Sequence, residues 1–264
     1  MDLKLKGKTA FISGSTSGIG FATAKLLLQE GVKVIINGRH QKGVSEIVDK
    51  LQKLVPNGVV KGIAADFSKS TEVDFLLEEL PLVDILINNV GFFTSQSFYE
   101  TTDEDWYKQI EVNVMSGVRL SRHFLPKMIR SNWGRILFVS SECATLVPSD
   151  LIAYSTSKAA LLAISRGLSQ MTPGTGVTVN TIIPGSTLTE GAISFLNGVA
   201  EKENKTRGEV EGEFFRKVRT SSLLERFASV EEIANTITYY SSPLSAATNG
   251  AVIKLDGGSM GGII

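Results

Sequence analysis

Short apolar runs alternate along the chain with longer segments in which apolar residues recur at helical spacing. The runs are apolar throughout instead of alternating with polar residues, which is typical of strands buried on both faces of a parallel sheet. Strands are predicted at residues 8–13, 32–37, 59–64, 83–88, 135–140, 177–183 and 251–255. Helices are predicted at residues 19–27, 44–51, 73–80, 102–131, 154–171 and 230–240.

This alternation predicts the fold class. Strands separated by helices imply right-handed crossovers and therefore a parallel sheet. About seven such units fill the chain without a linker or a change in composition. We expect one α/β domain over residues 1–264, a doubly wound Rossmann domain with a seven-stranded, mostly parallel sheet and helices on both faces. A closed eight-fold barrel is the competing arrangement, and the glycine cluster after the first strand favours the open sheet.

Residues 187–226 depart from the pattern. The segment is long and polar, with the charged sequence Glu-Lys-Glu-Asn-Lys at 201–205. An insertion of this size in a compact domain is usually a lid or a binding segment, so a substrate lid is predicted here. The segment also contains a stripe of apolar residues, which either packs onto the body of the domain or covers the bound substrate. The stripe consists of Ala192, Ile193, Phe195, Leu196 and Val199.

Charge and composition exclude several classes of protein. The chain has 27 basic and 27 acidic residues, and this balance argues against a nucleic-acid or anionic-membrane partner. A single cysteine, Cys143, excludes a disulfide framework, and two histidines, His40 and His123, make a metal site unexpected. No apolar run approaches the length of a membrane span, and the N-terminus lacks the apolar region of a secretory signal. A cytoplasmic location is expected.

A glycine-rich loop joins the first strand to the first helix. Glycine lets the backbone turn tightly and approach a ligand closely, and the helix N-terminus offers free N–H groups to a pyrophosphate. The alternative is a tight turn that binds no ligand. The residues predicted to hold a dinucleotide here are Gly14, Ser15, Thr16, Ser17, Gly18, Ile19 and Gly20.

Four further motifs follow in a characteristic order. They are Asn88-Asn89-Val90-Gly91, Ser141 with Tyr154-x-x-x-Lys158, Pro184-Gly185 and Asp256-Gly257-Gly258. With the glycine loop, they make the sequence resemble the short-chain dehydrogenase/reductase family in its YxxxK branch, and in particular the 3-oxoacyl-thioester reductases. The resemblance covers nearly the whole chain. Ser13 replaces the usual threonine and keeps its hydroxyl, and Val90 replaces the usual alanine.

The end of the second strand indicates the nucleotide. A carboxylate there would accept hydrogen bonds from the adenosine ribose, but residues 37–40 read Asn-Gly-Arg-His. The missing charged acceptor costs roughly 1.5–3 kcal/mol against NAD. Arg39 offers a planar fork suited to a 2′-phosphate, and by resemblance an arginine at this place marks the NADP users. A solvated surface arginine is the alternative.

The resemblance implies the remaining cofactor contacts. Asp66 and Phe67 correspond to the pair that holds the adenine, although Asp66 is also an ordinary helix N-terminal acid. Asn89 and Gly91 correspond to residues along the adenosine ribose, whereas Asn88 is expected to be structural. The nicotinamide is expected to be bordered by Ile183, Pro184, Gly185, Thr187 and Thr189, with Thr189 fixing the carboxamide.

Tyr154 and Lys158 are four residues apart in a helical pattern and therefore share one face. A neighbouring ammonium is expected to lower the pKa of the tyrosine and to make it a general acid and base near neutrality. Both residues are also expected to contact the cofactor. The Ser141 hydroxyl is placed to hydrogen-bond a substrate oxygen. The alternative for an isolated tyrosine and lysine at this spacing is an ordinary helix surface.

Asn113 lies inside a predicted helix, where asparagine is unfavourable. It either bonds a neighbouring loop or, as the resemblance implies, bends the helix and helps to hold a water beside the lysine. Asn113, Ser141, Tyr154 and Lys158 then form a catalytic tetrad. Glu142 is expected to form a structural salt bridge and Cys143 to be packed. Phe92 and Phe93 either pack or border an apolar substrate pocket.

The leading hypothesis is an NADP(H)-dependent oxidoreductase that reduces a carbonyl to an alcohol, or the reverse, on a small and possibly apolar molecule. A non-catalytic dinucleotide-binding sensor on the same fold is the alternative. An S-adenosylmethionine methyltransferase shares the glycine-rich loop but favours an acid where Arg39 stands. The resemblance also implies a homotetramer with helices 102–131 and 151–171 at an interface. The small residues expected to allow close packing there are Ser157, Ala159, Ala160 and Ala163.

Overall fold

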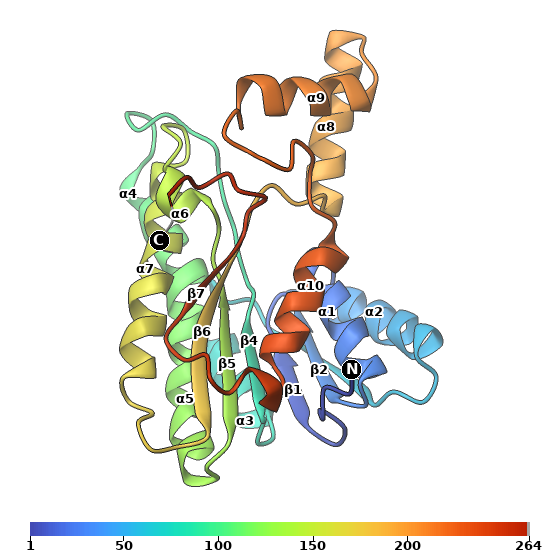
Figure 1. Ribbon diagram of the computed structural model, residues 1–264, viewed down its shortest axis with the longest axis vertical. Coiled ribbons are helices and arrows are strands. Elements are labelled where there is room, and N and C mark those ends of the chain that lie inside the picture. Colours follow the sequence, from blue (N-terminus) through green and yellow to red (C-terminus); the bar gives the residue numbers. More distant parts are fainter. Residues whose placement is uncertain (263–264) are drawn as a thin grey trace.

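The computed structural model describes residues 1–262, and its strands form one sheet in the order β3-β2-β1-β4-β5-β6-β7 (Figure 1). Every pair of neighbouring strands is parallel, so the predicted mostly parallel sheet is confirmed and the barrel is wrong. The strands are β1 Thr9–Ile12, β2 Lys33–Gly38, β3 Val60–Ala64, β4 Ile85–Asn88, β5 Gly134–Val139, β6 Val177–Pro184 and β7 Val252–Leu255. The strand order reverses between β1 and β4, where open sheets of this class bind their ligands.

Helices cover both faces of the sheet (Figure 1). The helices are α1 Gly18–Gln29, α2 Gln41–Leu54, α3 Ser70–Glu79, α4 Asp103–Gln109, α5 Ser116–Arg130, α6 Cys143–Leu146, α7 Ile152–Ser169, α8 Glu190–Glu203, α9 Arg207–Lys217 and α10 Val230–Tyr240. The predicted long helix 102–131 is interrupted by a π-helical segment, η1, at Ile110–Met115, and a 3-10 turn, η2, lies at Pro243–Ser245. Each predicted strand and helix therefore has an observed counterpart.

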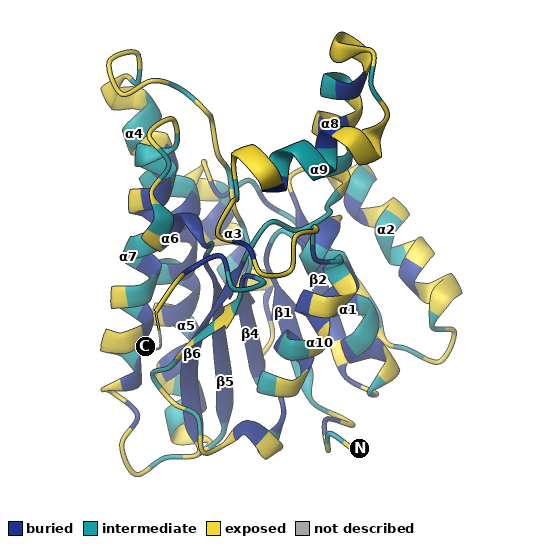
Figure 2. Ribbon diagram, turned by 45° about the horizontal axis from the view of Figure 1, so that its top comes forward, coloured by how far each residue is buried: buried dark blue, intermediate teal, exposed yellow. Residues whose placement is uncertain are grey.

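Two buried apolar clusters explain why the strands read as continuous apolar runs. On β1, Ala10 and Ile12 belong to the cluster that includes α1, α2 and α10, whereas Phe11 between them belongs to the cluster that includes α3, α5 and α7. Successive strand residues point to opposite faces, so a sheet covered on both faces requires apolar residues at nearly every position. The sheet accordingly forms the buried centre of the molecule (Figure 2).

The predicted lid corresponds to α8, α9 and their flanking loops, which extend beyond the carboxyl edge of the sheet (Figures 1 and 2). A parallel bridge between Thr187 and Ala228 brings the two ends of this α8–α9 segment together. In the apolar stripe, Leu196 is buried and Val199 packs with it against Val210 of α9, while Phe195 is 65% exposed. Part of the stripe therefore packs within the segment itself, an arrangement that neither alternative considered.

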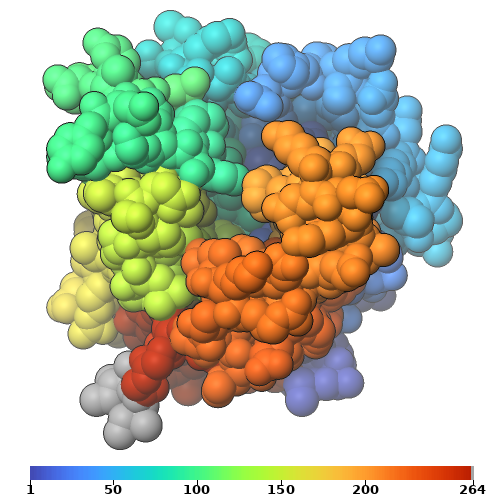
Figure 3. Space-filling view, turned by 90° about the horizontal axis from the view of Figure 1, so that it is seen from above, coloured from blue at the N-terminus to red at the C-terminus, as the bar shows by residue number. Residues whose placement is uncertain are grey.

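Seen from above, the molecule is hollowed between the region around residues 90–150 and the α8–α9 segment (Figure 3). The hollow lies over the carboxyl ends of the central strands, where the predicted site residues gather. In the described part of the chain, no helix combines the length and apolar character that a membrane crossing would require.

Candidate active site

The glycine loop between β1 and α1 has the conformation that its sequence predicts. Gly14 and Gly18 have φ angles of +60° and +56°, which favour glycine. A Cβ on Gly20 would lie 2.6 Å from the Gly14 carbonyl oxygen, so a side chain there would force the loop apart. Three of the loop's glycines are thus required by backbone geometry. They add no side chains of their own at the N-terminus of α1, where N–H groups suit a dinucleotide pyrophosphate.

Asn37 has a role that the sequence did not indicate. Its side chain is buried, and its amide nitrogen donates to the Ile63 and Ala65 carbonyl oxygens at 3.1 and 3.3 Å. Its carbonyl oxygen accepts from the Gly14 N–H at 3.2 Å. Asn37 therefore connects the glycine loop to β3 and is not free to bind a ribose. A polar residue at the end of an apolar strand was the available signal.

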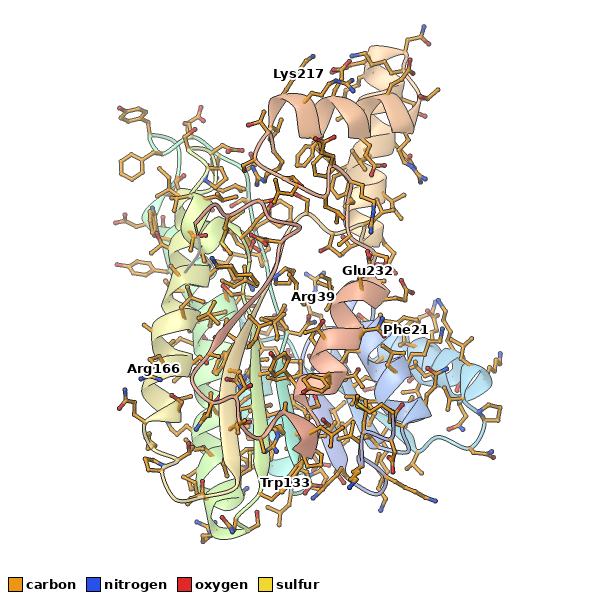
Figure 4. All side chains as sticks on the ribbon, in the orientation of Figure 1. Phe21, Arg39, Trp133, Arg166, Lys217 and Glu232 are labelled. Carbon is orange, nitrogen blue, oxygen red and sulfur yellow. The ribbon has the colours of Figure 1, made fainter. Side chains whose placement is uncertain are left out.

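Arg39 follows β2 directly and is exposed at the carboxyl end of the sheet, on the side of the α8–α9 segment, whereas Trp133 marks the opposite end (Figure 4). Asp66 lies just beyond the end of the neighbouring strand β3. Burial opposes ionisation of Asp66, but hydrogen bonds from Ser68 and the charges of Lys69 and Arg39 leave its pKa below the ordinary value. Phe67 is a core residue, 3% exposed, so its aromatic ring is not available to an adenine.

The residues after β4 hold the other side of the glycine loop. The Ser13 hydroxyl accepts hydrogen bonds from the N–H groups of Asn89 and Val90 at 3.0 and 3.1 Å. The Asn89 amide donates to the carbonyl oxygens of Ser13 and Gly14 at 3.1 and 2.7 Å, so its contacts position the loop. A Cβ on Gly91 would lie 3.2 Å from Lys158 Nζ, which places Gly91 beside the predicted catalytic lysine.

Asn113 is buried in the π-helical segment η1. Its carbonyl oxygen accepts from the Phe92 N–H at 2.8 Å, and its amide donates to the Phe92 carbonyl oxygen at 2.8 Å and to Ser157 Oγ at 2.9 Å. Asn113 thus joins the loop after β4 to the segment η1 and to helix α7. π-Helical segments are rare and occur frequently at functional sites. The two readings of Asn113 are compatible, because it bonds a loop where the helix is distorted.

Ser141 follows β5, and Tyr154 and Lys158 lie on α7. The Lys158 ammonium donates to the Val139 carbonyl oxygen at 3.0 Å and lies 5.9 Å from the centre of the Tyr154 ring. The backbone oxygen of Lys158 accepts from the Ser140 hydroxyl at 2.8 Å, which ties α7 to the end of β5. The Phe93 ring lies 5.7 Å from the Tyr154 ring, so Phe93 borders the site and Phe92 does so through its backbone.

The pKa of Tyr154 differs from the prediction. Burial raises the pKa of Tyr154 to about 12, and a hydrogen bond with Ser141 offsets part of this rise, while Cys143 and Glu142 add to it. Burial lowers the pKa of Lys158 to about 8. The predicted lowering of the tyrosine pKa by the lysine was wrong because the ammonium is directed to Val139 and desolvation dominates. At neutral pH the tyrosine is protonated and suited to donate a proton.

The start of α8 lies against the glycine loop. Thr189 is the N-cap of α8 and accepts a hydrogen bond from the Ala192 N–H at 3.2 Å. The carboxylate of Glu190 accepts from the Gly18 N–H at 2.9 Å, across 172 residues of sequence. The structure therefore brings Thr189 to Gly18, whereas Thr187 bonds the Gly185 carbonyl oxygen at 2.9 Å. The contact of Glu190 was not predicted, because only the fold makes it close.

Pro184 ends β6, and Gly185 packs directly on the backbone of Asp256. A Cβ on Gly185 would lie 2.6 Å from the Asp256 Cα. The Asp256 carboxylate accepts from the Gly258 and Met260 N–H groups at 3.2 and 2.7 Å, so the Asp-Gly-Gly motif forms a turn at the end of β7. The Asp-Gly-Gly turn therefore packs against the end of β6 and supports Pro184 and Gly185.

Glu142, the residue after Ser141, forms the expected salt bridge. Its carboxylate accepts from Arg219 Nε at 2.8 Å and from Ser186 Oγ at 3.0 Å. The Arg219 side chain is 14% exposed and the Glu142 side chain 4%. Cys143 is buried, and burial raises its pKa, in agreement with a packing role. The partner of Glu142 lies in the predicted lid, which the sequence did not indicate.

Comparisons with known proteins agree with this geometry. The family model described as short chain dehydrogenase matches residues 8–198. An uncharacterized oxidoreductase of Bacillus subtilis, YvrD, is 46% identical over 261 residues, covering 98% of each chain. The 3-oxoacyl-[acyl-carrier-protein] reductase of Aquifex aeolicus is 30% identical over 261 residues, covering 98% of this chain and 99% of its own.

A solved structure is similar to this chain over the full length of both. The L-sorbose reductase from Gluconobacter frateurii, complexed with NADPH and L-sorbose, has a TM-score of 0.92 and 30% identity, with all of both chains covered. The matched sequence, the parallel sheet order and the arrangement of serine, tyrosine and lysine at its carboxyl edge lead to one conclusion. The chain is an oxidoreductase and belongs to the short-chain dehydrogenase/reductase family.

Proposed function

We propose that this protein is an NADPH-dependent carbonyl reductase, reversible as an alcohol dehydrogenase. The observation that carries the proposal is the convergence of Ser141, Tyr154 and Lys158 beside a glycine cradle that side chains would fill. Such a cradle at a helix N-terminus suits a pyrophosphate. The reduced nicotinamide would supply the hydride, as it does in dehydrogenases generally.

The protein's own residues would handle the proton and the substrate oxygen. Tyr154, protonated at neutral pH, would donate its proton to the oxygen of the reduced carbonyl, and Ser141 would hydrogen-bond the same oxygen. Lys158 would contact the cofactor ribose and stabilise the phenolate that remains. Asn113 would hold the loop and α7 in register for the proton relay.

The cofactor preference is a separate element of the proposal. Arg39 would pair with the 2′-phosphate of NADPH, since it is exposed at the end of β2 and Asn37 is occupied by backbone contacts. The surrounding contacts would come from the loop 14–20, Asp66, Asn89, Gly91, Pro184, Gly185, Thr187 and Thr189. The solved L-sorbose reductase and a putative NAD(P)-dependent gluconate 5-dehydrogenase from Beutenbergia cavernae contain NADPH and NADP, which supports this assignment.

A homotetramer with α4–α5 and α7 at an interface is also proposed, with one revision. Ser157 is buried and bonds Asn113 within the chain, so it cannot contribute to a face between copies. Ala163 is exposed on α7 and remains available for close packing, while Ala159 and Ala160 are partly buried.

The proposed function is tested with a panel of ketones, 3-oxoesters and ketoses, following NADPH and NADH consumption. Tyr154→Phe removes one hydroxyl, so we expect the fold and NADPH binding to survive while turnover falls about 10²- to 10⁴-fold. Tyr107→Phe, on the exposed surface of α4, is the matched control and should keep full activity. Full activity of Tyr154→Phe would overturn the mechanism, and NADPH binding without turnover across the panel would favour the non-catalytic sensor.

A further inference from the structure

The α8–α9 segment reaches the neighbourhood of the catalytic residues through one charged side chain. Arg219 follows α9, and its guanidinium lies against the short stretch after β5 that carries Ser141. Nε donates to the Glu142 carboxylate at 2.8 Å, and one terminal nitrogen lies 3.8 Å from Cys143 Sγ. These contacts connect residues 77 and 76 positions apart in sequence.

Glu142 is held from several sides, and it directly follows Ser141 in the chain. Its N–H donates to the Pro184 carbonyl oxygen at 2.9 Å, and its carboxylate oxygen Oε1 accepts from both Arg219 and Ser186. The other carboxylate oxygen, Oε2, is buried without a hydrogen-bond partner. A buried carboxylate needs a compensating charge, and Arg219 supplies it at this position.

We propose that Arg219 and Glu142 are positioning residues: their ion pair holds the α8–α9 segment closed over the site and neutralises a carboxylate charge beside Tyr154. Neither residue touches the reacting atoms. Arg219 acts on the chemistry through Glu142, and Glu142 acts through Tyr154. This inference rests on the proposed function, because it assigns both residues to the proton transfer by Tyr154.

The electrostatic part follows from the groups around Tyr154. Lys158, on the same helix, lies 5.9 Å from the centre of the Tyr154 ring. Glu142 and Cys143 after β5 act on Tyr154 through their charges, and Arg219 pairs with Glu142. A negative charge on Glu142 opposes formation of the phenolate, and the positive charge of Arg219 opposes that effect. Removing the charge of Arg219 alone should therefore make proton loss from Tyr154 harder, and removing the charge of Glu142 alone should make it easier.

The test uses the pH dependence of NADP⁺-linked oxidation of the alcohol product of the best panel substrate. In this direction Tyr154 must be ionised, so the rate rises with pH through its pKa. Arg219→Met should move the midpoint up by about one pH unit, which is measured as an about tenfold lower rate at a fixed pH below the midpoint. Glu142→Gln should move the midpoint down by a similar amount, and the double variant should return it to the parent value.

The second role of the ion pair, holding the α8–α9 segment closed, is called the latch. It is measured separately by limited trypsin digestion, because residues 187–226 contain exposed Lys202 and Lys217. Both single variants and the double variant should be cleaved in this segment at least about tenfold faster than the parent, since each lacks the buried ion pair. Arg219→Lys keeps the charge and should restore both the pH midpoint and most of the protection. Glu201→Gln, at an exposed position of the same segment, leaves every trypsin site in place and is the control that should change neither measurement.

The two measurements separate the possible failures. Unchanged pH midpoints in both single variants would overturn the electrostatic role, and unchanged digestion rates would overturn the latch. A midpoint that stays shifted in the double variant would also overturn the role of the charge pair. If the parent protein turns over no substrate, or Tyr154→Phe keeps full activity, the proposed function fails, while the digestion experiment still tests the latch.

Discussion

The sheet and the α8–α9 segment are stabilised in different ways. All residues of β5 and β6 are buried, and the two apolar clusters that cover the sheet extend over most of the domain. The α8–α9 segment is largely exposed or half-buried (Figure 2), with a small cluster whose buried members are Leu196, Ala200 and Val210. It also has surface ion pairs of Lys205 with Glu203 and Glu213. Exposed ion pairs contribute roughly 0–1 kcal/mol each.

This difference assigns separate tasks to the two regions. Catalytic groups require positions fixed to a fraction of an ångström. The tetrad lies directly after β5, in η1 and on α7, which pack around the sheet. A segment with few buried apolar contacts opens locally at a lower free energy than the domain unfolds. The α8–α9 segment is attached at the Thr187–Ala228 bridge and by the contacts of Glu190 and Arg219, so we expect it to open without disturbing the tetrad.

The largest effect is expected from removing core volume under the site. Phe138 on β5 is fully buried, and its ring atom Cε1 lies 2.7 Å from where a Cβ on Gly117 would stand. Phe138→Ala should lower the free energy of unfolding by roughly 3–5 kcal/mol because it leaves a cavity in a close-packed core. Urea denaturation followed by circular dichroism measures this loss.

The matched variant is Leu196→Ala, which removes a buried side chain from the α8–α9 cluster. It should lower the free energy of global unfolding by less than Phe138→Ala does, while accelerating tryptic cleavage within residues 187–226. Phe195→Ala, at a 65% exposed position of the same helix, is the control for helix α8 itself. Equal global losses for Phe138→Ala and Leu196→Ala would mean that the segment and the sheet unfold as one unit.

The sequence predicted the sheet more completely than the site. Apart from the buried Arg135 at the start of β5, strands β5 and β6 are apolar or neutral because both faces are covered, and this pattern is local in sequence. The interruption of the long helix by η1 was not predicted as a π-helical segment, because it depends on Asn113 bonding Phe92 from another part of the chain.

Within the site, motif residues were predictable and their partners were not. Tyr154, Lys158 and Ser141 are recognisable from spacing, whereas the contacts of Glu190 with Gly18 and of Arg219 with Glu142 span 172 and 77 residues. Spacing also could not give the pKa of Tyr154, since desolvation by the folded chain is the largest cause of its rise. Burial, unlike helix register, is a property of the whole fold.

An intermediate effect is expected from Arg39, which belongs to the sheet region and not to the α8–α9 segment. Arg39→Ala should weaken NADPH binding about ten- to a hundredfold with little change for NADH, because it removes a charge-assisted contact of roughly 1.5–3 kcal/mol. Isothermal titration of both cofactors measures the change. Arg39 follows β2 and lies outside the α8–α9 segment, so the tryptic cleavage rate of the free protein should not change. Equal affinities of the parent protein for NADPH and NADH would refute the assignment.

The smallest effect concerns Glu190, where the two regions meet. Its carboxylate accepts a hydrogen bond from the first N–H of α1, at the helix terminus that the cofactor pyrophosphate is proposed to approach. An anion there is stabilised by the helix dipole and would repel a second anion. Glu190→Gln keeps the size of the side chain and removes its charge. NADPH should then bind roughly two- to fivefold more tightly, corresponding to the typical 0.3–1 kcal/mol for a charge at a helix terminus.

The same variant should loosen the α8–α9 segment in the free protein, because the contact with Gly18 becomes weaker. Tryptic cleavage within residues 187–226 should accelerate without cofactor and return to the parent rate with saturating NADPH. Glu201→Gln, exposed on the same helix, should alter neither the affinity nor the cleavage. If Glu190→Gln instead weakens NADPH binding, Glu190 holds the segment closed over the bound cofactor and does not compete with it. The sign of this one change therefore decides whether the contact between the two regions opposes cofactor binding or supports it.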